Sequence, residues 1–269
     1  MLVHKLILKL CIACGLMVAW ISAAAASDDP AVVVLFGDSI TVGENESSYY
    51  QDCPKAGGLR RGFGMGRSDF CTPDMVLSAL LNDSDRPAIV LNQGEGGTSS
   101  MNGVSRLGAA LDLAKSQHNG SVYYVLILYG TNDFGQGLST SDTRNNVRTM
   151  INIAEGRGFI PLVSNLLPRN DRDVSGAENG AIFSAASLEG AQFVDQYSNF
   201  NSKGGFALHD NEAPRLPASL RLHPTKQGYT VVAEHWFGAA LSSLIEPLKN
   251  TPPVGPIMLL LDDESAAPM

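Results

Sequence analysis

The sequence predicts an α/β domain in which a mostly parallel, doubly wound, five-stranded sheet lies between two layers of helices. Two observations support this three-layer fold class. Short apolar runs rich in β-branched residues alternate along the chain with segments of helical periodicity, as expected for a parallel sheet with crossover helices. The runs are continuously apolar, which is typical of strands buried on both faces. No internal repeat or shift in composition marks a second domain.

The first predicted strand, residues 31–36, reads Ala-Val-Val-Val-Leu-Phe. Such an apolar, β-branched run favours an extended backbone buried within a sheet. Two further runs have the same character, and two weaker ones complete the set. In chain order, the other four predicted strands are Ala88–Asn92, Val122–Tyr129, Phe159–Ser164 and Gln192–Val194.

Helical periodicity fills the stretches around these strands. Ser141 and Asp142 predict an N-terminal cap for the third helix, and Gly158 predicts its end. Pro247 predicts the end of the last helix, because the residue before a proline is pushed out of the helical region. The predicted helices are Pro73–Leu81, Val104–Ser116, Ser141–Arg157, Ala181–Leu188 and Thr225–Ile245.

The N-terminus has the three parts of a secretory signal peptide. Lys5 and Lys9 supply positive charge, Leu10–Ile21 is almost entirely apolar, and Ala23–Ala26 offers small residues for cleavage. An uncleaved membrane anchor is the alternative, but the apolar run is shorter than the roughly 20 residues that a span needs. We therefore expect a secreted or periplasmic protein without stable membrane insertion, organised as a signal peptide (1–26), one domain (27–250) and a C-terminal tail (251–269).

The cysteine content agrees with export. Cys11 and Cys14 lie in the predicted signal peptide, which leaves Cys53 and Cys71 in the mature chain. An even pair in an exported protein predicts a disulfide, here across a glycine-rich segment. Two unpaired thiols are the alternative. The formal net charge of −8 argues against a nucleic-acid partner, which requires a basic surface.

Polar, glycine-bearing clusters follow the first three predicted strands. They are residues 37–40 (Gly-Asp-Ser-Ile), 92–99 (Asn-Gln-Gly-Glu-Gly-Gly-Thr-Ser) and 130–133 (Gly-Thr-Asn-Asp), and a fourth cluster at 223–229 opens the last helix. Each cluster alone is ordinary turn and capping chemistry. Ligands of α/β sheets, however, bind at the carboxyl ends of the strands. The order of the four clusters along the chain therefore indicates that they form one functional site at this edge of the sheet.

The order of these clusters resembles the SGNH/GDSL hydrolase family of esterases and lipases, over residues 32–229. The resemblance implies that family's flavodoxin-like fold and the hydrolysis of carboxylic esters. It also implies that Ser39 is the nucleophile and that His223 is its general base. A serine hydroxyl is a poor nucleophile at neutral pH, so a base must take its proton during attack.

The same resemblance implies an oxyanion hole. Gly97 matches the family's oxyanion glycine, because it lies five residues after Asn92 and nine before Arg106. The Asn132 side chain matches the second donor, and the Ser39 amide is the third. Donors aimed at the developing negative charge lower the barrier, and one such donor contributes about 10²–10³ in turnover.

The sequence departs from the family at the third member of the triad. The family's aspartate, three residues before the histidine, is Leu220 here. Three alternatives remain: a loop carboxylate reaches His223, with Asp210 or Glu212 nearest in sequence; a backbone carbonyl orients the ring in a Ser–His dyad; or catalysis has been lost. The retention of Ser39 and His223 argues against the last, and we favour the dyad slightly.

No cofactor or metal is expected. The other histidines of the mature chain, His118, His209 and His235, show no metal-ligand spacing, although His209 beside Asp210 is a candidate for lining the site. The glycines at 94–97 lack the Lys-Ser/Thr ending of a phosphate loop.

The expected substrate is a small-molecule or carbohydrate ester. The segment Glu44–Asp74 follows the nucleophile and mixes aromatic with polar groups (Tyr49, Tyr50, Arg60, Arg61 and Phe63), which favours a sugar or short acyl ester over a long chain. A lipase or lysophospholipase is the alternative within the same chemistry. A noncatalytic glycan-binding protein on the same scaffold is the alternative outside it.

Overall fold

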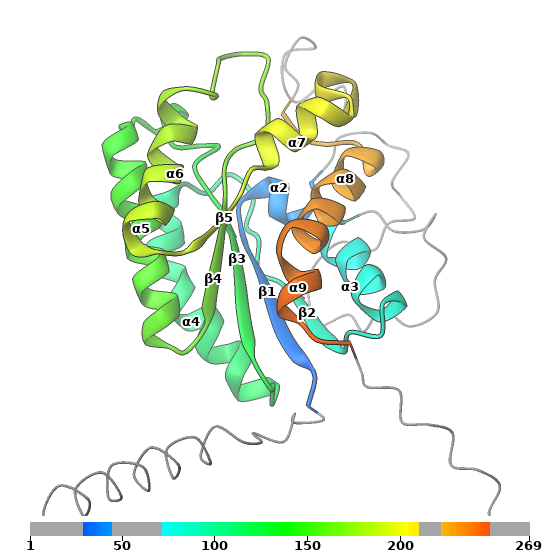
Figure 1. Cartoon of the computed structure of the whole chain (residues 1–269). Helices are drawn as coiled ribbons and strands as arrows, with labels where there is room; N and C mark the ends of the chain where they lie inside the picture. The colour runs from blue at the N-terminus through cyan, green and yellow to red at the C-terminus, as the bar shows by residue number, and fades with distance from the viewer. Residues whose placement is uncertain (1–28, 45–71, 210–221, 248–269) are drawn as a thin grey trace, which may run out of the picture.

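The computed structural model describes residues 29–44, 72–209 and 222–247. Within them, five strands form one sheet in the order β2-β1-β3-β4-β5 (Figure 1). All four pairings between neighbouring strands are parallel, which confirms the predicted fold class. The strands are β1 (Ala31–Gly37), β2 (Ala88–Asn92), β3 (Tyr123–Leu128), β4 (Ile160–Ser164) and β5 (Gln192–Val194).

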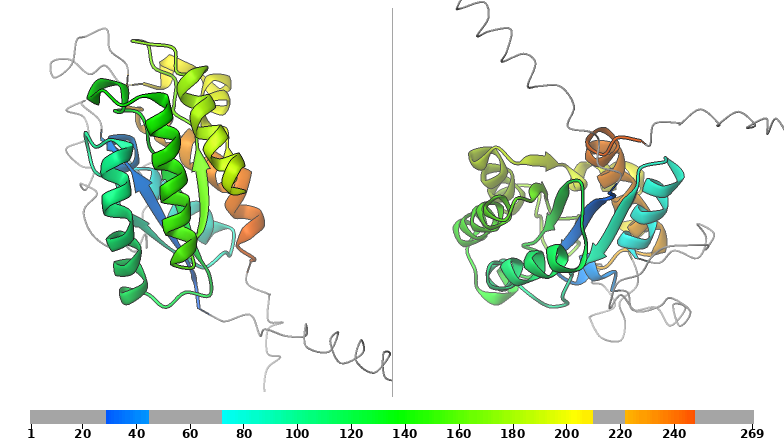
Figure 2. Two further views of the ribbon diagram at one scale, coloured as in Figure 1. Left: turned by 90° about the vertical axis from the view of Figure 1, so that its left-hand side faces the viewer. Right: turned by 90° about the horizontal axis from the view of Figure 1, so that it is seen from below.

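Helices cover both faces of the sheet, as Figures 1 and 2 show. One layer consists of α4 (Ser100–Gln117), α5 (Thr140–Gly156) and α6 (Ala177–Glu189). The other is built mainly from α3 (Pro73–Asp83) and α8 (Lys226–Trp236). The shorter elements are α2 (Ser39–Val42), η3 (Phe134–Gln136), α7 (Gln196–Lys203), η4 (Gly205–Leu208), η5 (Phe237–Leu241) and α9 (Ser242–Leu244).

The central strand β1 divides its side chains between two hydrophobic cores. Val33 and Leu35 belong to the core beneath α3 and α8, whereas Val32, Val34 and Phe36 belong to the core beneath α4, α5 and α6. All seven residues of β1 are buried. The continuous apolar run in the sequence therefore has its expected cause, because both faces of the strand are covered.

The structure corrects four helix assignments. Helix α4 begins at Ser100 and not at Val104, and α6 begins at Ala177 and not at Ala181. The last helix does not run unbroken from Thr225 to Ile245, because η5 is a π-helical segment between α8 and α9. The chain leaves the helix at Ile245, before Pro247, as predicted. The N-cap of α5 is Ser139 and not Ser141, since the Ser139 hydroxyl accepts from the Asp142 amide at 3.2 Å.

A further helix, α7, was not predicted. Its polar composition gives little amphipathic signal, but the Asp195 carboxylate caps it by accepting from the Ser198 amide at 3.0 Å. Among the described residues, no helix is both long and apolar enough to cross a membrane. The predicted signal peptide (1–26), the Cys53 and Cys71 pair and the tail (251–269) lie outside the described residues, so these remain predictions.

Candidate active site

Ser39 is the first residue of α2, directly after β1. Asp38 caps this short helix, because its Oδ1 accepts from the Ile40 amide at 3.0 Å. Glycine is needed at position 37, since a Cβ there would lie 2.4 Å from the Leu128 carbonyl oxygen at the end of β3. The tight turn thus fixes Ser39 at the carboxyl edge of the sheet, where the side chain is almost fully buried.

His223 meets Ser39 at this edge. The two residues are separated by 184 positions, yet His223 Nε2 lies 2.8 Å from Ser39 Oγ. His223 is itself buried, with 6% of its surface exposed. This distance suits direct proton transfer from the hydroxyl to the imidazole, so the structure brings together the two residues that the sequence paired.

The residues after His223 anchor it to the rest of the domain. The Thr225 amide and hydroxyl both donate to the Leu208 carbonyl, at 2.7 and 3.0 Å. A Cβ at Gly228 would lie 2.4 Å from that same carbonyl oxygen, so only glycine allows this close packing. The Tyr229 hydroxyl donates to the Glu44 carbonyl. Together these contacts hold the start of α8 against the segment after Ser39.

Gly97 and Asn132 lie on two linked loops. Gly97 has φ +72°, and nothing lies within 4 Å of the position that its Cβ would take. Its carbonyl accepts from Gln136 Nε2 at 2.7 Å, and the next carbonyl, of Thr98, accepts from Asn132 Nδ2 at 2.9 Å. The second N–H of the Asn132 amide donates to no described residue. These two hydrogen bonds therefore tie the loop after β3 to the loop after β2.

Arg106 of α4 braces the loop that carries Gly97. It donates to the Tyr129 hydroxyl at 2.7 Å and to the Gln93 carbonyl at 3.0 Å, and it pairs with the Glu95 carboxylate. The Tyr129 hydroxyl also lies 3.2 Å from Thr98 Oγ1. In the sequence, Arg106 served only as a spacing marker; its bracing role was missed, because the contact with Tyr129 exists only in the folded chain.

Asp133 anchors the loop after β3 from behind. Its buried carboxylate accepts from the Ser100 amide at 2.7 Å and hydroxyl at 2.5 Å, and from the Thr143 hydroxyl at 2.6 Å. Ser100 and Thr143 lie in the first turns of α4 and α5. Asp133 thus ties two helices to the carboxyl edge of the sheet, next to Asn132.

Asp38 combines complete burial with a titratable carboxyl. Burial raises its pKa from 3.8 to about 7, because a charged group is disfavoured away from water. The Ile40 amide and His223 oppose the rise, while the Asp133 carboxylate adds to it. The Thr131 hydroxyl also lowers this pKa, but it does not complete a hydrogen bond to Oδ2, which has no partner among the described residues.

The group that orients His223 is not decided by these residues. Asp210, Glu212 and Leu220 lie outside the described residues, so the loop carboxylate and the dyad both remain open. His209 is buried, and its ring packs at 4.9 Å from that of Phe200. A β-bridge joins His209 to Pro224, the residue after His223, which places it beside the site.

No group of three or more His, Cys, Asp or Glu side chains in the described part of the chain is arranged to hold a metal ion. The other two histidines of that part lie at the C-terminal ends of helices. His118 caps the end of α4, and His235 lies in the last turn of α8.

Comparison with known proteins places this geometry in context. Residues 35–231 match the profile of the GDSL-like lipase/acylhydrolase family, a range that contains Ser39, Gly97, Asn132 and His223. No curated protein sequence matches the chain significantly.

Solved structures of low sequence identity share the fold. A psychrotrophic esterase from a Pseudoalteromonas species, inhibited by monoethylphosphonate, is 14% identical with a TM-score of 0.56, over 79% of this chain and 98% of that one. A lipase/acylhydrolase from Enterococcus faecalis is 16% identical with a TM-score of 0.55, over 81% and 98%. An acetylxylan esterase from Geobacillus stearothermophilus is 17% identical with a TM-score of 0.53, over 80% and 95%.

Proposed function

The chain belongs to the GDSL-like lipase/acylhydrolase family and is a carboxylic-ester hydrolase, and from this premise we propose that it is an exported esterase for acetyl or other short acyl esters, carried on carbohydrate. In this proposal Ser39 is the nucleophile and His223 the general base. The observation that carries it is the 2.8 Å contact between His223 Nε2 and Ser39 Oγ.

Two steps make up the proposed reaction. Ser39 Oγ attacks the ester carbonyl carbon as His223 Nε2 takes its proton, and the tetrahedral intermediate then expels the alcohol, which receives that proton. Water repeats the sequence on the acyl-enzyme and releases the acid. The group that orients His223 is either a carboxylate from residues 210–221, which lie outside the described part, or a backbone carbonyl in a Ser–His dyad, which we favour slightly.

The oxyanion donors in this proposal are the Ser39 and Gly97 amides and the Asn132 side chain. Their arrangement is supported by preorganisation: the hydrogen bond from Asn132 to the Thr98 carbonyl fixes the amide plane, and the positive φ of Gly97 fixes the backbone that carries its N–H. Donors already in place cost no reorganisation when charge develops on the carbonyl oxygen.

Carbohydrate as the alcohol component is supported by two observations. The acetylxylan esterase from Geobacillus stearothermophilus shares this fold. The segment 44–74 after the nucleophile is also rich in aromatic and polar residues. A preference for long acyl chains would instead indicate the lipase or lysophospholipase alternative.

The direct test is hydrolysis of p-nitrophenyl acetate by wild type, Ser39→Ala and His223→Ala, with Ser105→Ala as an exposed serine control on α4. Loss of the nucleophile or its base removes most of the rate enhancement, so both variants should fall well below about one tenth of wild type while Ser105→Ala keeps full activity. Residual activity above that level in a pure preparation contradicts the assignment. An inactive wild type supports the noncatalytic alternative.

A further inference from the structure

The turn that carries Asn132 has a central carbonyl that cannot be satisfied within the turn. Residues 130–133 form a turn closed by the Asp133 amide, which donates to the Gly130 carbonyl at 3.1 Å. The carbonyl of the central peptide, here that of Thr131, points away from such a turn. Thr131 is buried, and a buried carbonyl needs a hydrogen-bond donor. The donor must therefore come from another segment of the chain.

Two arginines in the segment between β4 and α6 donate to this carbonyl. Arg169 Nη1 lies 2.5 Å and Arg172 Nη2 lies 3.0 Å from the Thr131 oxygen. Both side chains are largely buried, with 9% and 16% of their surfaces exposed. Charged donors form stronger hydrogen bonds than neutral ones. Two cationic donors thus bind one carbonyl oxygen, and they fix the plane of the peptide between Thr131 and Asn132.

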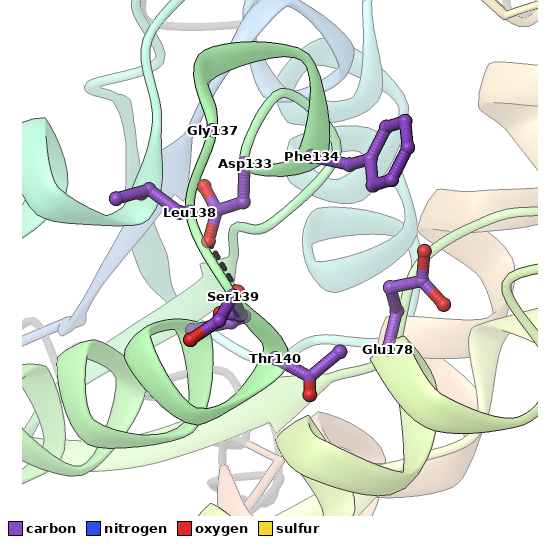
Figure 3. Close-up of a pocket in the computed structure, with 8 residues that line it drawn as sticks. Asp133, Phe134, Gly137, Leu138, Ser139, Thr140 and Glu178 are labelled. Carbon is purple, nitrogen blue, oxygen red and sulfur yellow. Dashed lines mark hydrogen bonds between the residues drawn. The ribbon is translucent and has the colours of Figure 1, made fainter.

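Other side chains hold both guanidinium groups in place. The Asp171 carboxylate accepts from Arg169 Nε and Nη2, each at 2.8 Å, which is a bidentate pair. Arg172 pairs with Glu178 at 3.3 Å, and its guanidinium carbon lies 4.9 Å from the centre of the Phe134 ring. Figure 3 shows the Phe134 ring and the Glu178 carboxylate extending from different elements on the same side of a pocket. Because carboxylates balance their charges, these arginines are suited to anchoring the turn.

The direction of the Thr131 carbonyl is coupled to the backbone at Asn132. Type I and type II turns differ by a rotation of the central peptide, and type II requires a positive φ at the third residue of the turn. Asn132 is that residue, and asparagine tolerates a positive φ better than most residues. Asp85 is the only non-glycine residue with a positive φ in the described part of the chain, so Asn132 has a negative φ. Rotating the peptide would break both contacts with the arginines.

We propose that Arg169 and Arg172 are positioning residues for ester hydrolysis, which hold the peptide between Thr131 and Asn132 so that the Asn132 side chain stays in place as an oxyanion donor. The inference rests on the proposed function, in which Asn132 is one of three such donors. When the arginine contacts are lost, the peptide can rotate, and the Asn132 amide is correctly placed in only a fraction of the molecules. An oxyanion donor that must reorganise during the reaction stabilises the transition state less.

The test is a double-mutant cycle between Arg169→Leu and Asn132→Ala, measured by steady-state hydrolysis of p-nitrophenyl acetate. Because Arg172 still binds the carbonyl, Arg169→Leu alone should lower kcat about tenfold at constant KM, less than the roughly 10²–10³ of a lost oxyanion donor. Asn132→Ala leaves no side-chain donor to position, so adding Arg169→Leu to it should change kcat by less than about twofold. Arg169→Lys keeps one charged donor and should restore part of the rate.

Arg148→Leu is the matched control for the loss of an arginine. Arg148 also pairs with a carboxylate, that of Glu189 at 2.5 Å. This pair joins α5 to the end of α6 and not to the turn at 130–133. The variant loses an ion pair and leaves the turn intact, so its kcat should equal that of wild type.

The NMR signals of the Asn132 side-chain amide, identified by their loss in Asn132→Ala, test the positioning without reference to activity. They should shift or broaden in Arg169→Leu and stay unchanged in Arg148→Leu. If wild type hydrolyses no ester, the proposed function fails, and these signals alone decide whether Arg169 positions Asn132.

Four results overturn the positioning role. They are an unchanged kcat in Arg169→Leu, an equal fall in kcat with and without the Asn132 side chain, a fall of the same size in Arg148→Leu, and amide signals of Asn132 that do not respond to Arg169→Leu.

Discussion

Asp38 shows how much the residue next to a nucleophile is constrained. Its carboxylate must cap α2 through the Ile40 amide, and yet it has no exposed surface. The same group lies close enough to His223 for the two charges to interact. Because burial keeps Asp38 protonated in the native chain below about pH 7, its role there is to shape the turn as an acceptor for the Ile40 amide.

The raised pKa of Asp38 predicts a pH-dependent cost in stability. Between pH 3.8 and about 7 the unfolded chain releases this proton while the native chain holds it, so rising pH favours unfolding. Asp38→Asn keeps an acceptor for the Ile40 amide and removes the titration. Relative to wild type, the free energy of unfolding of the variant should therefore rise across this window, by up to about 4 kcal/mol from the change in pKa.

Urea unfolding at pH 4, 5.5 and 7.5 measures this difference. Asp142→Asn serves as the control, because the pKa of Asp142 is lowered by its hydrogen bonds to Ser139. That group contributes stability above pH 3.8 that is lost only at lower pH, so its difference from wild type stays flat between pH 4 and 7.5. An equally flat curve for Asp38→Asn contradicts the assigned pKa.

Leu220 occupies the position of the family's aspartate, so another group must orient the His223 ring. In the dyad that we favour, Asp210→Asn and Glu212→Gln keep ester hydrolysis within a few fold of wild type. Leu220→Asp should then raise kcat, because it supplies the carboxylate that the family has three residues before the histidine. A fall on the order of 10³–10⁴ in Asp210→Asn, by analogy with triad mutants, identifies that carboxylate as the partner instead.

At the scale of elements, the loop after β2 is held by long-range contacts. Arg106 reaches it from α4, and the guanidinium also lies 5.3 Å from the centre of the Phe36 ring at the end of β1. Removing this side chain takes away the donor to the Gln93 carbonyl and one of the two partners of the Tyr129 hydroxyl. We expect the loop that carries Gly97 to shift when these contacts are lost.

Arg106→Leu should therefore lower kcat about 10- to 100-fold with little change in KM, because a misplaced oxyanion donor matters mainly in the transition state. Arg106→Lys should restore part of the loss. Arg157→Leu is the control, since Arg157 forms an exposed ion pair with Asp112 on α4, and such pairs contribute little. Steady-state kinetics on p-nitrophenyl acetate distinguishes the outcomes, and a rise in KM at constant kcat refutes the positioning role.

Elements with a dense local signal were predictable from the sequence. The second strand has the predicted bounds and the first differs by one residue, because apolar β-branched runs specify buried strands directly. The weaker fourth and fifth runs also form strands, within one residue of the predicted bounds. The π-helical η5 was not predictable, since it depends on how the end of α8 packs. The bonds from Arg106 to Tyr129 and from Asp133 to Ser100 join different elements, so no spacing along the chain reveals them.

At the scale of the whole molecule, the strand order explains where the site forms. In the sheet, β2 lies on one side of β1 and β3 lies on the other. The connection that leaves β1 and the connection that leaves β3 therefore run in opposite directions, and they diverge at the carboxyl ends of these two strands. Ligands of open α/β sheets bind at such a switch point. Ser39 follows β1 and Asn132 follows β3, which places the proposed nucleophile and oxyanion donor on either side of it.

Export is the last prediction and concerns the whole chain. We propose that residues 1–26 are removed and that the oxidising compartment then joins Cys53 to Cys71. N-terminal sequencing of the exported protein should start at Ser27, and mass spectrometry of non-reduced peptides should find the two cysteines linked. Because the bond closes a short loop in the unfolded chain, Cys53→Ser with Cys71→Ser should lower the free energy of unfolding by about 3 kcal/mol in the chain-entropy model. Two free thiols in the exported protein, or an intact N-terminus, would contradict this organisation even if ester hydrolysis is found.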